Sequence, residues 1–131
     1  MELNWIAIVA AGVAAFLLGG LWYAPLLFGR AWQADCGLSD EQLKQGNMVW
    51  IFGGALILSV LAAAMFSMFL GPRPELGFAA GAGFSAGLFW VAASLGIFYL
   101  FERRPLRLWL INGGYATAMF MLIGAVLSLL G

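Results

Sequence analysis

The stretch GGLWYAPLLFGRAW (Gly19–Trp32) is too apolar for an exposed loop, yet it carries a proline where an apolar helix would otherwise continue. Proline donates no backbone hydrogen bond, and its ring clashes with the carbonyl group four residues earlier. The helix before Pro25 is therefore expected to kink or to end near Ala24. The rings of Trp22 and Tyr23 would then lie at the depth of the lipid headgroups, which amphipathic rings prefer. We interpret the residues after the break as a short segment that lies in the membrane interface.

The composition on both sides of this stretch is that of an integral membrane protein. Of the 131 residues, 64% are hydrophobic and 9% are charged, whereas soluble domains carry about 25% charged residues. A hydrocarbon layer about 30 Å thick is crossed by about 20 apolar helical residues. Four segments meet this requirement, and we place their helices at approximately residues 4–24, 40–70, 76–101 and 106–130. The sequence thus predicts an all-α bundle of four transmembrane helices in a single domain, residues 1–131.

The second helix has a start signal in the polar loop before its apolar part. Ser39 and Gln42 form the pattern of a capping box, and acidic residues follow Ser39 directly. The helix is therefore expected to begin near Asp40. Gly46 and Asn47 form a weak point between this start and the apolar part.

The distribution of Lys and Arg predicts the orientation in the membrane. The loop after the second span carries Arg73 as its basic residue, whereas the loops after the first and third spans carry Arg30, Lys44, Arg103, Arg104 and Arg107. Because positively charged loops stay in the cytoplasm, these two loops are predicted to be cytoplasmic. Both termini would then lie on the outer side of the membrane.

The side chains that usually carry chemistry are missing from the apolar segments. The chain has no histidine and a single cysteine, Cys36, and its charged residues cluster between the spans or at their ends. Ionisable groups inside a membrane mark ion and proton pathways, and acid–base or nucleophilic catalysis needs histidine, a carboxylate or an activated thiol. We therefore expect no enzymatic activity, no cofactor and no metal site. A net charge of zero without a basic run also argues against a nucleic-acid partner.

Small residues at four-residue spacing indicate how the helices associate, since close approach of backbones replaces hydrophobic drive in lipid. The third span carries two such rows, Gly77 with Gly81 and Ser85, and Ala79 with Gly83 and Gly87. The offset of two residues puts these rows on opposite sides of the helix. We expect the third span at the centre of the bundle, or between its own bundle and a second subunit. Packing within one chain and a homo-oligomer interface both remain open.

Asn112 is the most polar side chain within a span. Its amide cannot be satisfied fully within its own helix, so it is expected to bond to another helix or to a loosened backbone. The alternative is a polar contact to a permeating solute or ligand. At Pro25, similarly, backbone carbonyls freed by the break could line a ligand or lipid site. Near the membrane surface, an anionic lipid headgroup could bind Arg103, Arg104 and Arg107, although orientation alone also explains these charges.

Several motifs resemble a bacterial family of small four-helix membrane proteins known as Domain of Unknown Function 1761. They are NW (Asn4–Trp5), GLWYAP (Gly20–Pro25) with Phe28, Gly29 and Trp32, and LINGGY (Leu110–Tyr115). The resemblance covers essentially the whole chain, with hydropathy alone matching between Cys36 and Phe101. It implies a multi-pass protein of the bacterial inner (plasma) membrane and assigns no catalytic residue. It also favours treating one set of residues as a joint ligand, lipid or interface site near the cytoplasmic side: Trp22, Tyr23, Pro25, Asn112 and Tyr115.

Dense helix-contact residues without reactive groups favour a non-enzymatic protein that works by packing, as an assembly or accessory subunit. Its expected partners are membrane lipids, itself as a homo-oligomer, or another membrane protein. The alternative is a homo-oligomeric channel or facilitator for a small solute or ion, lined by Asn112, serine side chains and freed backbone groups.

Overall fold

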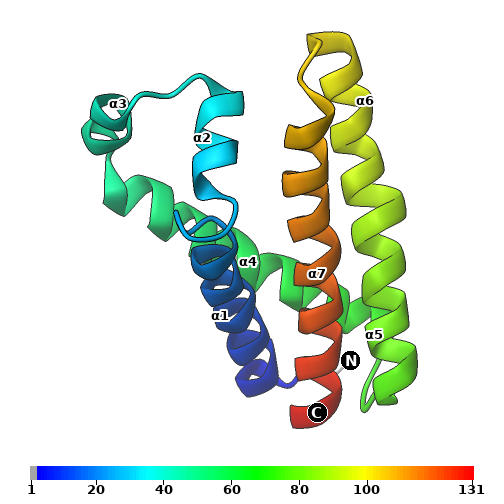
Figure 1. The fold of residues 1–131 in the computed structure, drawn as a ribbon. Helices are drawn as coiled ribbons and strands as arrows, with labels where there is room; N and C mark the ends of the chain where they lie inside the picture. Colours follow the sequence, from blue (N-terminus) through cyan, green and yellow to red (C-terminus); the bar gives the residue numbers. More distant parts are fainter. Residues whose placement is uncertain (1–2) are drawn as a thin grey trace.

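The computed structural model describes residues 3–131, which fold into helices joined by short turns (Figure 1). The helices are α1 (Trp5–Trp22), α2 (Gly29–Cys36), α3 (Asp40–Gln45), α4 (Met48–Leu70), α5 (Leu76–Ser85), η1 (Ala86–Ala92), α6 (Ala93–Glu102) and α7 (Leu106–Leu130). α5, η1 and α6 form one continuous rod. This rod and α1, α4 and α7 are the four helices long and apolar enough to cross a membrane. The predicted all-α fold with four such helices is confirmed.

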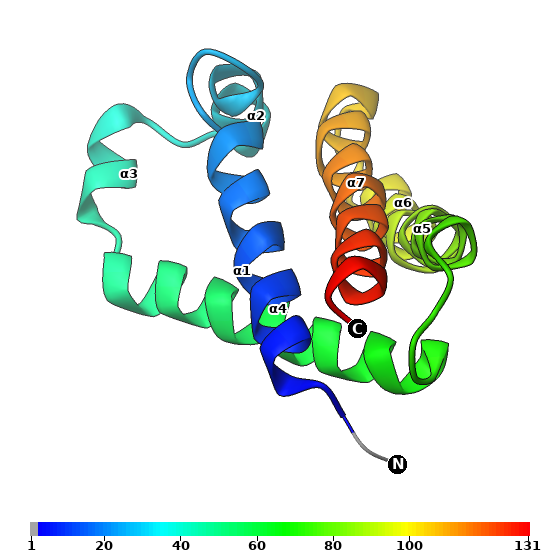
Figure 2. The same ribbon diagram turned by 90° about the horizontal axis from the view of Figure 1, so that it is seen from below.

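α7 is the central helix of the structure. It packs against α1 on one side and against the α5–η1–α6 rod on the other, and it also contacts α2 and α4. α4 crosses behind α1 and α7 at a steep angle, as the two views in Figures 1 and 2 show. Of the two positions expected for the third span, the centre of the bundle is therefore wrong for the single chain, and the position between two subunits stays a prediction. The rod lies at the edge because only one of its two rows of small residues meets α7.

The two rows of small residues differ in their surroundings. A Cβ atom added at Gly83 would meet the backbone of Phe120, and one added at Gly87 would meet the backbone of Ala116, both on α7. From the other side, a Cβ added to Gly124 of α7 would meet the backbone of Ala79. The row Ala79, Gly83 and Gly87 therefore forms a close backbone contact with α7, whereas the row Gly77, Gly81 and Ser85 is exposed.

The hydrophobic core lies where α1, α4, η1 and α7 meet. Its buried members are mostly alanines with a few large side chains: Ala7, Ile8, Ala11, Ala15, Ala63, Phe66, Ala86, Ile123 and Leu127. The crossing of α1 and α4 is close because Gly12 leaves no side chain in front of Val60, whose Cα would lie 2.7 Å from an added Cβ. Small residues thus let α4 cross α1 without a gap.

The helix expected over residues 40–70 is divided in two, which corrects the prediction of one continuous helix. The capping box of Ser39 and Gln42 is confirmed, and it starts the short helix α3. Gly46 then adopts an extended conformation, with φ −67° and ψ 149°. The Asn47 side chain accepts a hydrogen bond from the Trp50 amide and caps α4. The residues of the weak point therefore end one helix and start the next.

The middle of the rod, η1, is a π-helix, which the sequence analysis did not predict. Beside its end, the indole Nε1 of Trp109 donates to the carbonyl of Ala92 across 2.8 Å. Gly96 makes room for this indole, since an added Cβ would lie 2.9 Å from Nε1. The π-helix and Gly96 together hold the Trp109 ring of α7 against the rod.

Candidate functional site

The end of α1 and the middle of α7 meet in a cluster of aromatic and polar side chains. Trp22 Nε1 donates to the Ile111 carbonyl across 2.9 Å. In the opposite sense, the Tyr115 hydroxyl donates to the Ala15 carbonyl across 2.8 Å. The two rings lie beside each other, with centroids 6.3 Å apart. Each helix therefore supplies an aromatic donor to a carbonyl of the other.

Two glycines make this exchange possible. A Cβ added at Gly19 would lie 2.9 Å from the Tyr115 hydroxyl, and one added at Gly114 would lie 3.1 Å from the Trp22 ring. Each glycine thus opens the space into which the ring from the other helix fits.

Asn112 links three segments of the chain. Its Oδ1 accepts a hydrogen bond from the Tyr23 hydroxyl at 2.6 Å, and its Nδ2 donates to the Tyr99 hydroxyl oxygen of α6 at 2.8 Å. The prediction that Asn112 bonds to another helix is confirmed. Asn112 on α7 thus connects Tyr23, which follows α1, with Tyr99 of α6. We call Tyr23, Asn112 and Tyr99 the polar clasp.

The sequence-predicted residues separate into two groups. Trp22, Tyr23, Asn112 and Tyr115 come together, and the Tyr23 and Tyr115 rings pack edge to face with centroids 5.5 Å apart. Pro25 is exposed in the turn between α1 and α2 and makes no hydrogen bond to the cluster.

The backbone carbonyls before Pro25 are also occupied. The Leu21 carbonyl accepts from the Ala24 amide, and the Trp22 carbonyl accepts from the Phe28 amide. The turn closes on Gly29, where an added Cβ would clash with the backbone of Tyr23. These carbonyls therefore complete a tight turn and do not face a ligand.

Three members of the cluster were not predicted from the sequence: Tyr99, Phe28 and Trp32. The Phe28 ring packs on Trp22 with centroids 5.0 Å apart, and Trp32 packs on Tyr23 at 5.8 Å. Both belong to the motif that follows Pro25, which was a usable signal. Tyr99 had only its polar hydroxyl in an otherwise apolar segment as a signal.

The polar groups of the cluster are phenols, indoles and one amide, which bind and orient but do not act as strong acids or bases at neutral pH. Among the described side chains, no buried polar atom lacks a hydrogen-bond partner. Residues 3–131 contain no group of three or more His, Cys, Asp and Glu side chains that could hold a metal ion. Burial raises the pKa of the Cys36 thiol, which lies at the end of α2, so its thiolate is disfavoured. The arrangement is suited to holding helices together.

The family model described as "Protein of unknown function (DUF1761)" matches residues 6–128, nearly the whole chain. The chain belongs to the DUF1761 family. The comparisons with curated proteins and with solved structures give no match. The match to DUF1761 confirms the resemblance seen in the motifs at both ends of the chain.

The three arginines considered as a headgroup site have different surroundings in this DUF1761 protein. Arg107 donates to both carboxylate oxygens of Asp35, through Nε at 2.8 Å and Nη2 at 2.6 Å. Arg104 pairs with Glu102 at 3.1 Å. Arg103 ends α6 in the left-handed conformation, with φ 60°. Arg107 therefore fastens α2 to α7, and Arg103 and Arg104 lie together at the turn before α7.

The Asp35–Arg107 pair predicts a pH dependence of stability. Hydrogen bonds from Arg107 hold the pKa of the Asp35 carboxyl below its usual range. The stability that the pair contributes is therefore present above the ordinary carboxyl pKa, and is lost as the pH falls through the lowered pKa of the folded state. The measurement is the thermal unfolding midpoint from pH 7 to pH 3. At pH 7 the midpoint of the wild type should lie above that of Asp35→Asn. The difference should narrow as the pH falls towards 3, because the Asp35 carboxyl becomes increasingly protonated.

Glu41→Gln is the matched control, since Glu41 is exposed on α3 and makes no side-chain ion pair in the described structure. Its midpoints should follow those of the wild type across the same pH range. An equal effect of Asp35→Asn and Glu41→Gln would contradict a role for the pair.

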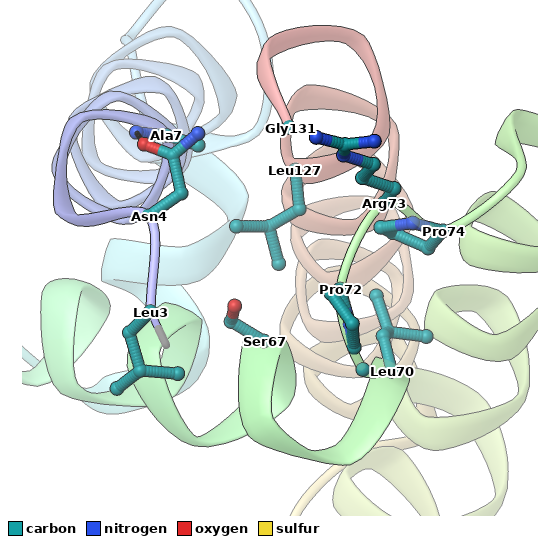
Figure 3. Close-up of a pocket in the computed structure, with 11 residues that line it drawn as sticks. Leu3, Asn4, Ala7, Ser67, Leu70, Pro72, Arg73, Pro74, Leu127 and Gly131 are labelled. Carbon is teal, nitrogen blue, oxygen red and sulfur yellow. Dashed lines mark hydrogen bonds between the residues drawn. The ribbon is translucent and has the colours of Figure 1, made fainter. Parts of the chain in front are cut away.

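A polar pocket of about 270 Å³ lies at the end of the molecule away from the aromatic cluster. The sequence analysis did not predict it. Figure 3 shows it between the start of α1, the end of α4 and the end of α7, with the Ser67 hydroxyl and the Arg73 side chain at its edges. Asn4 Nδ2 donates to the Leu130 carbonyl, and Ser128 donates to the Pro74 carbonyl. These two bonds tie the start of α1 and the turn after α4 to the end of α7.

Proposed function

We propose that this protein is a non-enzymatic protein of the bacterial inner membrane that acts by packing, as an assembly or accessory subunit that associates with a second copy of itself. The observation that carries the proposal is the exposed row of Gly77, Gly81 and Ser85. No atom lies within 4 Å of a Cβ added at Gly81. Rows of this kind let helices of two chains approach closely in lipid.

An apolar groove beside this row supports the proposal. It has a volume of about 300 Å³ and lies between the second half of α4 and the α5–η1 part of the rod. Its lining residues are Phe66, Phe69, Ala82, Ser85, Ala86, Phe89 and Trp90. Because Ser85 belongs to both the row and the groove, the two features form one surface. A helix of a second copy could place its side chains in the groove while its backbone approaches the row.

The hydrogen bonds of the polar side chains within the spans also favour packing over transport or catalysis. Asn112 is the most polar side chain within a span, and its amide oxygen and nitrogen are both engaged in the clasp. Ser59, Ser94 and Thr117 donate to carbonyls four residues earlier in their own helices. These groups are therefore satisfied without a solute.

The proposal includes the orientation of the chain in the membrane. It also includes the reason why α1 ends before Pro25. Both termini lie outside, because the cationic loops after the first and third spans remain in the cytoplasm. Pro25 ends α1 through its missing donor and its ring. α2 then lies in the cytoplasmic interface, where its exposed Arg30 reaches water.

Self-association is tested by crosslinking in native membranes, followed by size analysis in detergent. The wild type should give a crosslinked dimer, and Gly81→Leu should reduce its yield about fivefold or more, because the side chain separates the two backbones. Gly54→Leu on α4 is the control, since no atom lies within 4 Å of a Cβ added there and Gly54 is outside the proposed surface. A wild type found only as a monomer, or equal yields for the two variants, would refute the proposal.

A further inference from the structure

The turn between α6 and α7 borders a pocket of about 380 Å³ that adjoins the polar clasp at Tyr99 and shares no lining residue with the proposed association surface. Most of its lining is apolar, and two polar residues complete it: the lining consists of Ala93, Gly96, Ile97, Tyr99, Leu100, Arg104, Pro105, Leu106 and Trp109. An apolar pocket with one cationic residue fits a molecule with an apolar chain and an anionic end.

The apolar wall is held in place before any ligand arrives. The Trp109 indole is fixed by its hydrogen bond to the Ala92 carbonyl and by the space that Gly96 leaves for it. Gly113 lies behind the same ring, with an added Cβ 3.5 Å from Nε1. A preformed wall of this kind loses little entropy on binding.

The backbone also fixes the cationic edge. Arg103 takes the left-handed conformation that closes α6, and the Arg104 amide donates to the Tyr99 carbonyl across 2.9 Å. The Arg104 side chain uses its Nε for Glu102, which leaves its terminal amino groups outside that ion pair. Arg103 takes part in neither of the ion pairs described within residues 3–131. Two cations and one carboxylate thus lie at the turn.

Tyr99 lines this pocket and also belongs to the polar clasp. Its hydroxyl oxygen accepts from Asn112, so the hydroxyl hydrogen is left to donate elsewhere. Among the described hydrogen bonds, none has the Tyr99 hydroxyl as its donor.

We propose that this pocket binds an anionic phospholipid, with an acyl chain against Trp109 and the phosphate group on Arg104 and Arg103. The apolar part of the pocket, which has a total volume of about 380 Å³, can hold part of one acyl chain. A guanidinium binds a phosphate oxygen through charge-assisted hydrogen bonds. The positive turn favours a headgroup with net negative charge over a zwitterionic one.

Native mass spectrometry of the purified full chain tests the headgroup part of the proposal. Phosphatidylglycerol should be retained about fivefold more than phosphatidylcholine with the same acyl chains, as expected for about one additional Arg contact. Arg104→Gln should remove this preference. Arg30→Gln is the matched control, because it removes one exposed positive charge from α2 and should keep the preference.

The acyl chain is tested with phosphatidylglycerol that carries bromine atoms on its chains. Brominated lipid should quench wild-type tryptophan fluorescence more strongly than it quenches Trp109→Phe. Ala93→Phe, which fills the pocket from the exposed side of α6, should reduce quenching in the same way. If Arg104→Gln has the same thermal unfolding midpoint as the wild type, the variant keeps the fold.

Three results would overturn the proposal. The first is equal retention of the two lipids by the wild type, and the second is equal retention of phosphatidylglycerol by Arg104→Gln and Arg30→Gln. The third is binding of glycerol phosphate as strong as that of the lipid, which would show a phosphate site without an acyl pocket.

Discussion

Gly83→Val is expected to lower the free energy of unfolding by about 3 kcal/mol or more, at the upper end of the cost of overpacking. The added side chain would meet the Phe120 backbone of α7, which cannot rotate away as a side chain could. The rod and α7 would have to separate, and with them the contact of Gly87 and the position of Ala79 against Gly124. The measurement is thermal unfolding in detergent micelles, followed by circular dichroism.

Gly54→Val is the matched control for this experiment. It makes the same substitution in another long apolar helix, α4. An added Cβ at Gly54 meets no atom within 4 Å. Its unfolding midpoint should remain close to that of the wild type. If Gly83→Val were as stable as Gly54→Val, the close contact between the rod and α7 would be wrong.

Asn112→Leu is the second change with a large expected effect. It keeps the size of the side chain but removes both hydrogen bonds of the clasp, to Tyr23 and to Tyr99. Hydrogen bonds between membrane helices contribute about 0.6 kcal/mol on average and up to about 1.7 kcal/mol. We therefore expect a loss of about 1 to 3 kcal/mol, and about half of that loss for Tyr23→Phe, measured by thermal unfolding in micelles.

Thr117→Val on the same helix is the control for Asn112→Leu. Thr117 donates to the Gly113 carbonyl of its own helix, so its loss should change stability by only a few tenths of a kcal/mol. A variant Asn112→Leu as stable as Thr117→Val would contradict the clasp. Liposomes that lose solute flux with this variant, at unchanged stability, would instead favour the channel alternative.

Much of the fold could be predicted from the sequence because it depends on local properties of the chain. Apolar length gives the four long helices, and the capping box at Ser39 gives the start of α3. The partner type of Asn112 followed from the chemistry of a single amide in an apolar helix. The identity of its partners did not follow, because Tyr23 and Tyr99 come from opposite sides of α7 and are 89 and 13 residues away.

The arrangement of the helices was less predictable, because periodicity gives the faces of a helix but not the neighbour of each face. The two rows on the rod are alike in sequence, yet only the row of Ala79, Gly83 and Gly87 meets another helix within residues 3–131. The matching gap on α7 requires Gly124, which no spacing rule connects with Ala79. The central position of α7 thus depends on how its surface fits each neighbouring helix, and the composition of the helices does not predict it.

The corrected start of α4 has a local cause, whereas the ion-pair partner of Arg107 is distant in the sequence. At Gly46 and Asn47, a flexible residue followed by a good cap made a new helix start more favourable than continuation. At Arg107, the sequence grouped three cations by proximity, although Asp35 lies 72 residues earlier in the chain. Long-range ion pairs of this kind are outside the reach of local patterns.

The π-helix between α5 and α6 changes how the faces of this rod have to be counted. Each residue of a π-helix advances less around the axis than in an α-helix, so the side chains after Ala92 are out of phase with those before Ala86. A single helical wheel drawn over residues 76–102 would assign lipid-facing positions of α6 to the wrong side. Scanning substitutions in this rod should therefore be interpreted with two separate wheels, joined by an angular offset at residues 86–92.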